Sequence, residues 1–353
     1  MARSPTDHRV AVFGPDLLLS VTIEARGAAD DLHLHPAGQG VWVARMAAEL
    51  GAWPILCGFA GGETGAALTH LIGALPGEHR LVPTAGTSGG YVIDRRASTR
   101  QLVASALRPA PARHEIDDLV AATCAAALGC AAAVLCNPYP SDGLPDEIYD
   151  TLAGSIRAAG VPLLVDLSSP RLDRVLAHEP DLVKCNDWEL AEYISGPVDG
   201  QRAVAAAQRL SAAGARTVIV TRAERPVLVV PESGEPFEVV PPPFPHGFRE
   251  GCGDAMTGAI AAAWARGMDL RAALVLGAAA GAGNFLRHGL GTGRRAAIEE
   301  LAQHVTVRPL AASTAKTAAA AAPPGRSPRA QPSPPTAHGG RAGARRRAPE
   351  RPR

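Results

Sequence analysis

One stretch of the chain combines a carboxylate with a glycine-rich turn at the start of a helix. It runs from Gly247 to Gly258 and reads GFREGCGDAMTG, and residues 255–266 have the apolar spacing of a helix. Gly251 and Gly253 allow a tight turn that leaves peptide N–H groups bare at the positive end of the helix dipole, which predicts an anion site. Asp254 beside it is then either a general base for phosphoryl transfer to an alcohol or a simple helix cap.

Charge is distributed unevenly along the 353 residues. Nine arginines, one lysine and one glutamate lie from Arg308 onward, so the remainder of the chain is acidic although the net charge is only +1. Residues 311–353 are rich in Ala, Pro and Arg and nearly lack large apolar side chains, which predicts a disordered tail. A nucleic-acid-binding function would rest on this tail alone, and a solvated tail explains it as well.

Cysteine usage and hydropathy favour a cytoplasmic protein. None of the six cysteines forms a CxxC pair or has zinc-ligand spacing, so we expect them to be reduced and mostly buried. Residues 1–9 lack the apolar segment of a signal peptide, and no run of 18 apolar residues follows. His33 and His35 lie on one face of a predicted strand, where an exposed face fits better than a metal site.

Short apolar strands alternate with helical segments along most of the chain, which predicts an α/β fold with a mostly parallel sheet covered on both faces. The predicted strands are 10–13, 54–57, 132–135, 162–166, 182–185, 217–221, 227–230 and 237–240. The predicted helices are 41–50, 66–74, 116–127, 146–159, 171–178, 187–195, 201–213, 255–266 and 270–288. Segments at about 17–35 and 89–106 break this alternation and predict a small antiparallel lid over the sheet edge.

Four motifs in this order resemble the ribokinase-like (PfkB) carbohydrate kinases, in the branch of 1-phosphofructokinases and tagatose-phosphate kinases. They are residues 36–45 (PAGQGVWVAR), 58–65 (GFAGGETG), 184–190 (KCNDWEL) and 251–254 (GCGD). The resemblance covers about residues 10–307. It implies a three-layer α/β sandwich with a small β lid, a kinase domain at 10–310, and the use of ATP and Mg²⁺.

The resemblance also implies roles for residues on the catalytic and nucleotide side. Asp254 would be the general base, and the amides of Gly251, Cys252 and Gly253 the anion hole. Asn186 and Glu189 would order Mg²⁺ through water, or form only a capping box. The other nucleotide-binding candidates are Lys184, Thr221 and Asn284.

The acceptor side departs from the family pattern. The candidates there are Asp16, Gly38, Gln39, Gly40 and Trp42, where Gln39 replaces the signature Lys and Trp42 the signature Asn. The family's sugar-binding Asp aligns near Leu18, so Asp16 is displaced by two residues. The lid's usual Arg-Asn pair is also missing around residues 88–91, which argues against fructose 1-phosphate or fructose 6-phosphate as acceptor, because each charge-assisted contact contributes about 1.5–3 kcal/mol.

We therefore predict an ATP-dependent kinase that phosphorylates a hydroxyl of a sugar or sugar-like molecule. Trp42 could stack on a ring, so a nucleoside or glycoside fits as well as a free hexose. The alternative is a catalytically weak nucleotide- or sugar-binding regulatory protein on the same fold. We expect no membrane partner, and lid strands with open edges could pair two subunits into a homodimer.

Overall fold

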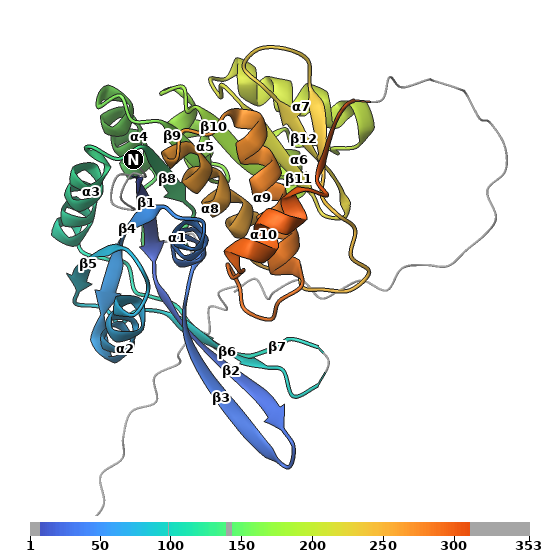
Figure 1. The fold of residues 1–353 in the computed structure, drawn as a ribbon. Helices are drawn as coiled ribbons and strands as arrows, with labels where there is room; N and C mark the ends of the chain where they lie inside the picture. Colours follow the sequence, from blue (N-terminus) through green and yellow to red (C-terminus); the bar gives the residue numbers. More distant parts are fainter. Residues whose placement is uncertain (1–7, 98, 139–142, 311–353) are drawn as a thin grey trace, which may run out of the picture. The chain divides into compact units, whose positions relative to one another are not determined.

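A mostly parallel sheet forms the centre of the structure (Figure 1). The computed structural model describes residues 8–97, 99–138 and 143–310, and the predicted tail at 311–353 lies outside them. Within the described residues the sheet has ten strands, which in spatial order are β14 (Thr306–Pro309), β13 (Phe237–Val240), β12 (Arg225–Val230), β11 (Val218–Arg222), β10 (Leu182–Asn186), β9 (Leu163–Asp166), β8 (Ala132–Cys136), β1 (Arg9–Asp16), β4 (Trp53–Gly61) and β5 (Glu78–Thr84). Neighbours from β11 to β5 are parallel, and β12, β13 and β14 are antiparallel.

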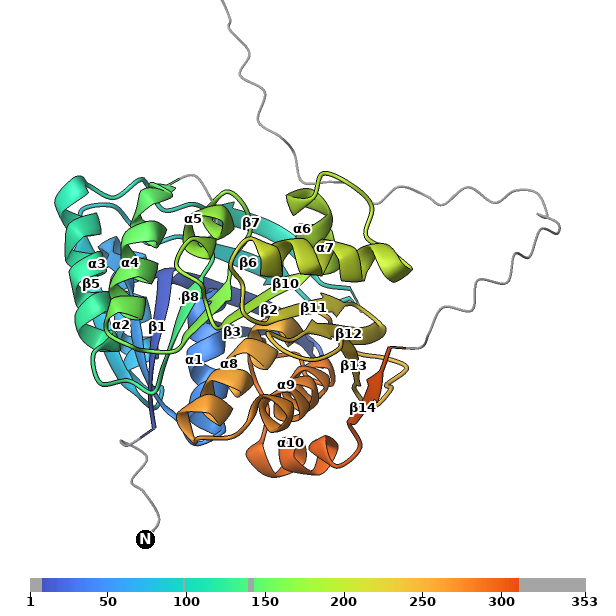
Figure 2. The same ribbon diagram turned by 90° about the horizontal axis from the view of Figure 1, so that it is seen from above.

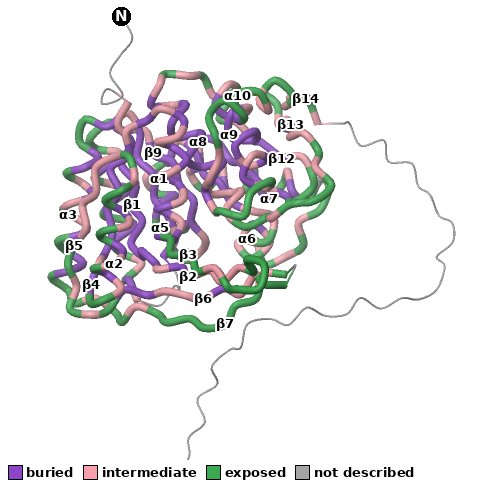
Figure 3. The backbone as a smooth tube through the Cα atoms, turned by 60° about the horizontal axis from the view of Figure 1, so that its bottom comes forward, coloured by how far each residue is buried: buried purple, intermediate pink, exposed green. Residues whose placement is uncertain are grey.

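Helices cover both faces of this sheet, as Figure 2 shows. One face packs against α3 (Arg113–Ala127), α4 (Glu147–Ala158), α5 (Arg171–Leu176), α6 (Asp187–Tyr193) and α7 (Gly200–Ala212). The other packs against α1 (Gln39–Glu49), α2 (Gly62–Gly73), α8 (Cys252–Ala265), α9 (Leu270–Phe285) and α10 (Arg295–Ala302). Alternate residues of β1 point to opposite faces of the sheet. Ala11 and Phe13 pack in the core beneath α3–α7, and Val10 and Val12 pack in the core on the other face. The three-layer sandwich is confirmed, with its buried residues at the centre (Figure 3).

A second, four-stranded sheet extends away from this body and is hereafter the lid (Figure 1). Its order is β3 (Ala29–Ala37), β2 (Leu18–Arg26), β6 (Gly90–Asp94) and β7 (Gln101–Ala106). The predicted strands are present, and β2 pairs with β3, and β6 with β7, in the predicted antiparallel sense, whereas β2 and β6 are parallel. Both strands leave the carboxyl edge of the main sheet, one after β1 and one after β5, so they run in the same direction.

Some element boundaries differ from the sequence-based ones. Helix α8 begins at Cys252, so its first turn includes the glycine-rich stretch itself. The GFAGGETG motif at 58–65 is the end of β4 followed directly by the start of α2. Strands β5 and β14 were missed because they are mostly not buried and carry no apolar run. Among the described residues, no helix is both long and apolar enough to cross a membrane.

The order of the sheet reverses between β1 and β8. The chain proceeds from β1 to β4 and β5 on one side, and from β8 to β9, β10 and β11 on the other. Ligands of open α/β sheets bind at such a reversal, outside the carboxyl ends of the strands. The fold therefore predicts a binding site beside Asp16 and Asn137, the residues at or just beyond those two ends.

Helix α1 reaches this edge through a close contact between two glycines. A Cβ atom on Gly40 would lie 2.5 Å from Cα of Gly14 in β1. No larger residue fits unless the helix moves away from the strand. The contact therefore fixes the start of α1 directly over the end of β1.

Replacing Gly40 by alanine should destabilise the fold by about 1–3 kcal/mol, because the added methyl group forces backbone to shift. Gly73, at the end of α2, has no atom within 4 Å of its missing Cβ, so Gly73→Ala should be neutral or slightly stabilising. Urea denaturation of both variants tests this. Equal effects at the two positions would contradict the close contact.

Candidate active site

The start of α8 forms a nest of backbone N–H groups. Gly251 is its N-cap and has a φ of 76°, in the left-handed region that glycine favours. The first helical bond runs from the N–H of Ala255 to the carbonyl of Gly251 at 2.9 Å, so the N–H groups of Cys252, Gly253 and Asp254 precede the intrahelical ladder. The N–H of Cys252 has a long contact of 3.3 Å to the carbonyl of Arg249. The nest is suited to an anion.

Asp254 lies beside this nest and faces a cavity of about 400 Å³. This catalytic cavity is lined by Leu18, Gly38, Gln39, Trp42, Tyr91, Ile93, Arg100, Leu102, Asn137, Pro138, Glu250, Asp254 and Leu290. Burial raises the pKa of Asp254 to about 7; Lys184 opposes that rise, Asp166 adds to it, and a hydrogen bond from Gln39 opposes it. A carboxylate with a raised pKa is a stronger base once ionised, as an acceptor hydroxyl requires.

Gln39 links α1, the end of β8 and Asp254. Its side-chain carbonyl accepts a hydrogen bond of 2.6 Å from the N–H of Asn137. This fixes the orientation of the amide, whose NH₂ group is left to donate to the Asp254 carboxylate. The residue that replaces the family's signature Lys therefore contacts the predicted base directly.

A buried ion pair lies behind the nest. The Lys184 ammonium donates to both carboxylate oxygens of Asp166, at 2.9 and 2.8 Å, and Thr257 in α8 donates to the same carboxylate at 2.7 Å. A Cβ atom on Gly253 would lie 2.8 Å from the Lys184 Nζ atom. Burial lowers the pKa of Lys184, but Asp166, Glu189 and Asp254 together raise it above its ordinary value. The cation thus stays charged next to the bare amides.

Asn186 and Glu189 form the capping box that was the alternative to a magnesium role. The side chain of Asn186 accepts from the N–H of Glu189, and the carboxylate of Glu189 accepts from the N–H of Asn186, both at 2.8 Å. Burial and Asp166 raise the pKa of Glu189, whereas Lys184 lowers it. Both residues are electrostatically part of the group around Lys184, but neither lines the catalytic cavity.

The other two nucleotide candidates lie apart from the catalytic cavity. Thr221, in β11, donates to the carbonyl of Cys185 at 3.4 Å. Asn284 is buried in α9, and its amide donates to the carbonyl of Glu250 and accepts from the N–H of Thr292. This arrangement braces the loop that enters α8, and the adenine contact of Asn284 stays a prediction.

The acceptor-side candidates separate into two groups. Gly38, Gln39 and Trp42 line the catalytic cavity, together with Leu18, which stands where the family has Asp. Asp16 is buried and accepts a 2.8 Å hydrogen bond from Arg108, whose guanidinium lies 4.9 Å from the Phe59 ring centre. Asp16 and Gly40 therefore support the floor of the site.

Two residues of the candidate site, Asp166 and Arg100, were not predicted from the sequence. Asp166 ends β9 beside the strand of Lys184, and a carboxylate closing a buried strand was a usable signal. Arg100 enters the catalytic cavity from the lid, and no local pattern marks it, since the lid's position over the body decides its role.

Comparison with known proteins identifies the family. Residues 13–297 match the pfkB family of carbohydrate kinases. A 1-phosphofructokinase of Rhodobacter capsulatus is 30% identical over 277 residues, 76% of this chain and 83% of that protein. The ATP-dependent 6-phosphofructokinase isozyme 2 of Mycobacterium tuberculosis is 28% identical over 272 residues, 75% of this chain and 78% of its own.

Solved structures show the same fold. A phosphofructokinase-2 mutant from Escherichia coli superposes with a TM-score of 0.75 at 23% identity, covering 84% of this chain and 98% of that one. Arabidopsis thaliana ribokinase gives a TM-score of 0.65 at 18% identity, covering 85% and 99%. The chain belongs to the pfkB family of carbohydrate kinases. It is thus a kinase that transfers a phosphoryl group from ATP to an alcohol group of a sugar.

If Asp254 is the general base, its raised pKa predicts the pH dependence of catalysis. Only the ionised carboxylate can take a proton, so kcat/KM for an uncharged acceptor should rise with pH up to about 7 and then level off. Loss of the Gln39 hydrogen bond in Gln39→Leu should move the rising part of the pH–rate profile to higher pH, because that bond favours the ionised form of Asp254. Initial rates of ADP formation across the acid and neutral range provide the measurement. An unchanged pH–rate profile in Gln39→Leu would contradict the Gln39–Asp254 contact.

Proposed function

We propose that the chain phosphorylates a hydroxyl of a sugar or sugar-like acceptor with Asp254 as the general base and the amides of Gly251, Cys252 and Gly253 as the anion hole. The main support for this proposal is that Asp254 faces the catalytic cavity directly beside those amides and that its pKa is raised. Asp254 takes the hydroxyl proton, and the amides stabilise the charge on the transferring phosphoryl group. Lys184, behind Gly253, adds positive potential to the same point.

Mg²⁺ fits this site as an ion held mainly by nucleotide and water. The described residues contain no group of three metal-ligating side chains, so this part of the chain offers no closed cage. Magnesium typically keeps several waters and is bound through one or two carboxylates plus phosphates. Glu189 and Asn186 would hold those waters, and the ion would neutralise phosphate charge.

The kinase domain would span residues 10–310, and the cytoplasmic location remains a prediction.

The acceptor would bind under the lid. Leu18, Trp42 and Ile93 give the cavity an apolar side, while Gln39 and Asp254 give it a polar end. This composition suits a polyol with an apolar ring face. Several relatives are named phosphofructokinases, which makes a ketohexose derivative the first acceptor to test. Closure of the lid would exclude water from the reaction.

The regulatory alternative gains no support from the site. A pure binder has no need of a carboxylate with a raised pKa next to an anion nest, since burying that charge costs stability. The base is retained together with its partners Gln39, Lys184 and Asp166. Catalysis explains this arrangement, and binding alone does not.

Replacing Asp254 by asparagine should lower turnover about 10²–10⁴-fold with little change in thermal unfolding, because it removes the base but keeps the shape. ADP release would be followed with ATP, Mg²⁺ and a panel of sugars, sugar phosphates and nucleosides. Asp117→Asn, in an exposed pair with Arg113, is the control and should match the wild type. More than a tenth of wild-type activity in Asp254→Asn would eliminate the proposed base.

The outer face of the lid supports the proposed homodimer. Leu32 and Leu34 on β3 are 60% and 49% exposed, and they pair across the sheet with Ile23 and Val21 on β2. A face of this kind gains stability when a second copy covers it.

Introducing a charge on that face should therefore separate the subunits. We expect light scattering after gel filtration to give the mass of two chains for the wild type and of one chain for Leu34→Asp. Leu128→Asp is the matched control, because this leucine is 64% exposed at the end of α3, away from the lid. A wild-type protein with the mass of one chain at micromolar concentration would exclude this dimer.

A further inference from the structure

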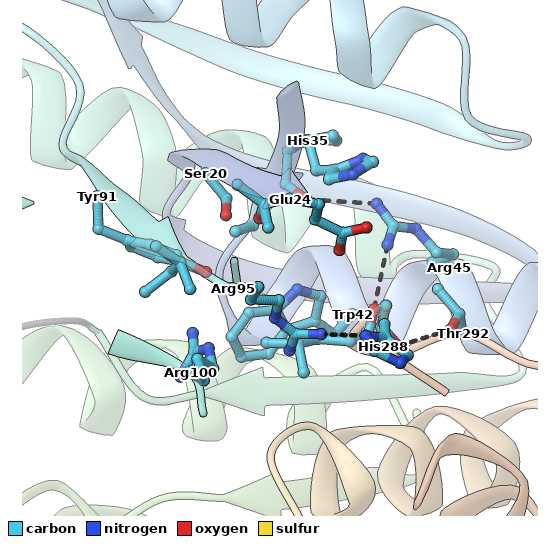
Figure 4. Close-up of a pocket in the computed structure, with 16 residues that line it drawn as sticks. Ser20, Glu24, His35, Trp42, Arg45, Tyr91, Arg95, Arg100, His288 and Thr292 are labelled. Carbon is cyan, nitrogen blue, oxygen red and sulfur yellow. Dashed lines mark hydrogen bonds between the residues drawn. The ribbon is translucent and has the colours of Figure 1, made fainter. Parts of the chain in front are cut away.

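A second, smaller cavity of about 140 Å³ lies beside the catalytic one and is hereafter the arginine pocket (Figure 4). The inner face of the lid forms one wall, and α1 with the loop after α9 forms the other. Its charged lining comes from distant parts of the chain: Arg45 from α1, Arg95 and Arg100 from the lid, His288 from the loop, and Glu24 from β2.

Positive charge is in excess in this pocket. Among the described residues that line it, Glu24 is the only carboxylate, against three guanidinium groups. Among the ion pairs of the described residues, none joins Arg45 or Arg95 to a carboxylate. Arg45 instead donates to the carbonyls of Leu290 at 3.1 Å and Pro36 at 3.3 Å.

The guanidinium of Arg95 contacts an imidazole and an aromatic ring. It contacts the Nδ1 atom of His288 at 2.8 Å and lies 4.9 Å from the ring centre of Phe248. Burial and the nearby Arg100 lower the pKa of Arg95, whereas Glu24 raises it. Arg100 has a 3.5 Å pair with Glu250. Partly buried cations of like sign oppose one another, so an anion between them would be bound favourably.

The arginine pocket borders the catalytic cavity and shares part of its lining. Trp42, Tyr91, Ile93, Arg100 and Leu290 line both. Gln39, Trp42 and Arg45 follow one another at intervals of three residues along α1. Because a helix rises 1.5 Å per residue, Arg45 lies about 9 Å beyond Gln39 along the helix axis. A single extended ligand could therefore reach from Asp254 to Arg45.

We propose that the arginine pocket binds an anionic group, a phosphate or carboxylate, at the end of the acceptor remote from the hydroxyl that Asp254 deprotonates. The acceptor is then a polyol with a hydroxyl at one end and an anion at the other. This inference rests on the proposed function for the hydroxyl end. The cations absent from the signature loop and from residues 88–91 are replaced by Arg45, Arg95 and Arg100, which are in other segments.

Two variants and a matched control test the proposal. Arg45→Gln and Arg95→Gln each remove one cation from the pocket. Arg96→Gln removes the neighbouring arginine on the same hairpin, which is bound to Asp94 and Asp30 on the exposed side and does not line the pocket. Gel filtration and thermal unfolding identify any variant that fails to fold.

Acceptor binding is measured by calorimetry in the Asp254→Asn background, so the result does not depend on turnover. The probes are fructose 1-phosphate, fructose 6-phosphate, gluconate, unphosphorylated fructose and inorganic phosphate. We expect at least one anionic sugar to bind about tenfold or more tightly than fructose. Arg45→Gln and Arg95→Gln should weaken that binding about 10–100-fold and leave fructose unchanged, with Arg96→Gln like the parent.

The outcomes separate this inference from the proposed function. Equal affinity for fructose and the anionic sugars, or anion binding that ignores Arg45 and Arg95, would overturn the inference even if the kinase assay succeeds. Arginine-dependent binding with no ADP release would uphold the pocket and reject the proposed chemistry. Inorganic phosphate that binds at the arginines without competing with an anionic sugar would also overturn it, because the pocket would then serve a separate anion.

Discussion

The balance of charge at the start of α8 is the constraint on which the site depends. Burial raises the pKa of the Asp254 carboxyl, and Lys184 prevents that rise from going further. Asp166 in turn forms an ion pair with Lys184, so neither ion is buried without a partner. The bare amides of Gly253 and its neighbours lie at the centre of this arrangement. The carboxylate can therefore exist next to an anion site without being permanently protonated.

Backbone packing is what brings these charges together. Gly40 lies against Gly14, which holds the start of α1 over the end of β1, and Gly258 in α8 meets the carbonyl of Val43 in α1. Helices α1 and α8, which supply Gln39 and Asp254, are thereby held side by side where the strand order of the sheet reverses. Small residues at crossing points allow a polar contact between segments more than two hundred positions apart.

The donor and acceptor halves of the site have changed to different extents. On the donor side the nest, the buried lysine and the capping box of Asn186 and Glu189 are all formed. On the acceptor side Gln39 is a hydrogen-bond partner of Asp254, and positive charge lies on the lid and in the middle of α1. Under the proposed function, the residues around the transferring phosphoryl group therefore match the family motifs, and those around the acceptor differ from them.

The sequence by itself determined the class of fold, the glycine-rich start of a helix at Gly251–Gly253 and the position of a carboxylate, Asp254, in its first turn, because these depend on local periodicity and on glycine conformation. It also pointed to Gln39 and Trp42 as departures at the acceptor. It could not determine that Asn186 and Glu189 form a capping box, that Asn284 is buried under the nest, or that Asp16 pairs with Arg108. Tertiary structure alone decided the parallel pairing of β2 with β6 and the gathering of Arg45, Arg95 and Arg100. The reason is physical: a side chain's partners depend on how separate elements pack, and the local pattern around each arginine is that of an ordinary exposed residue.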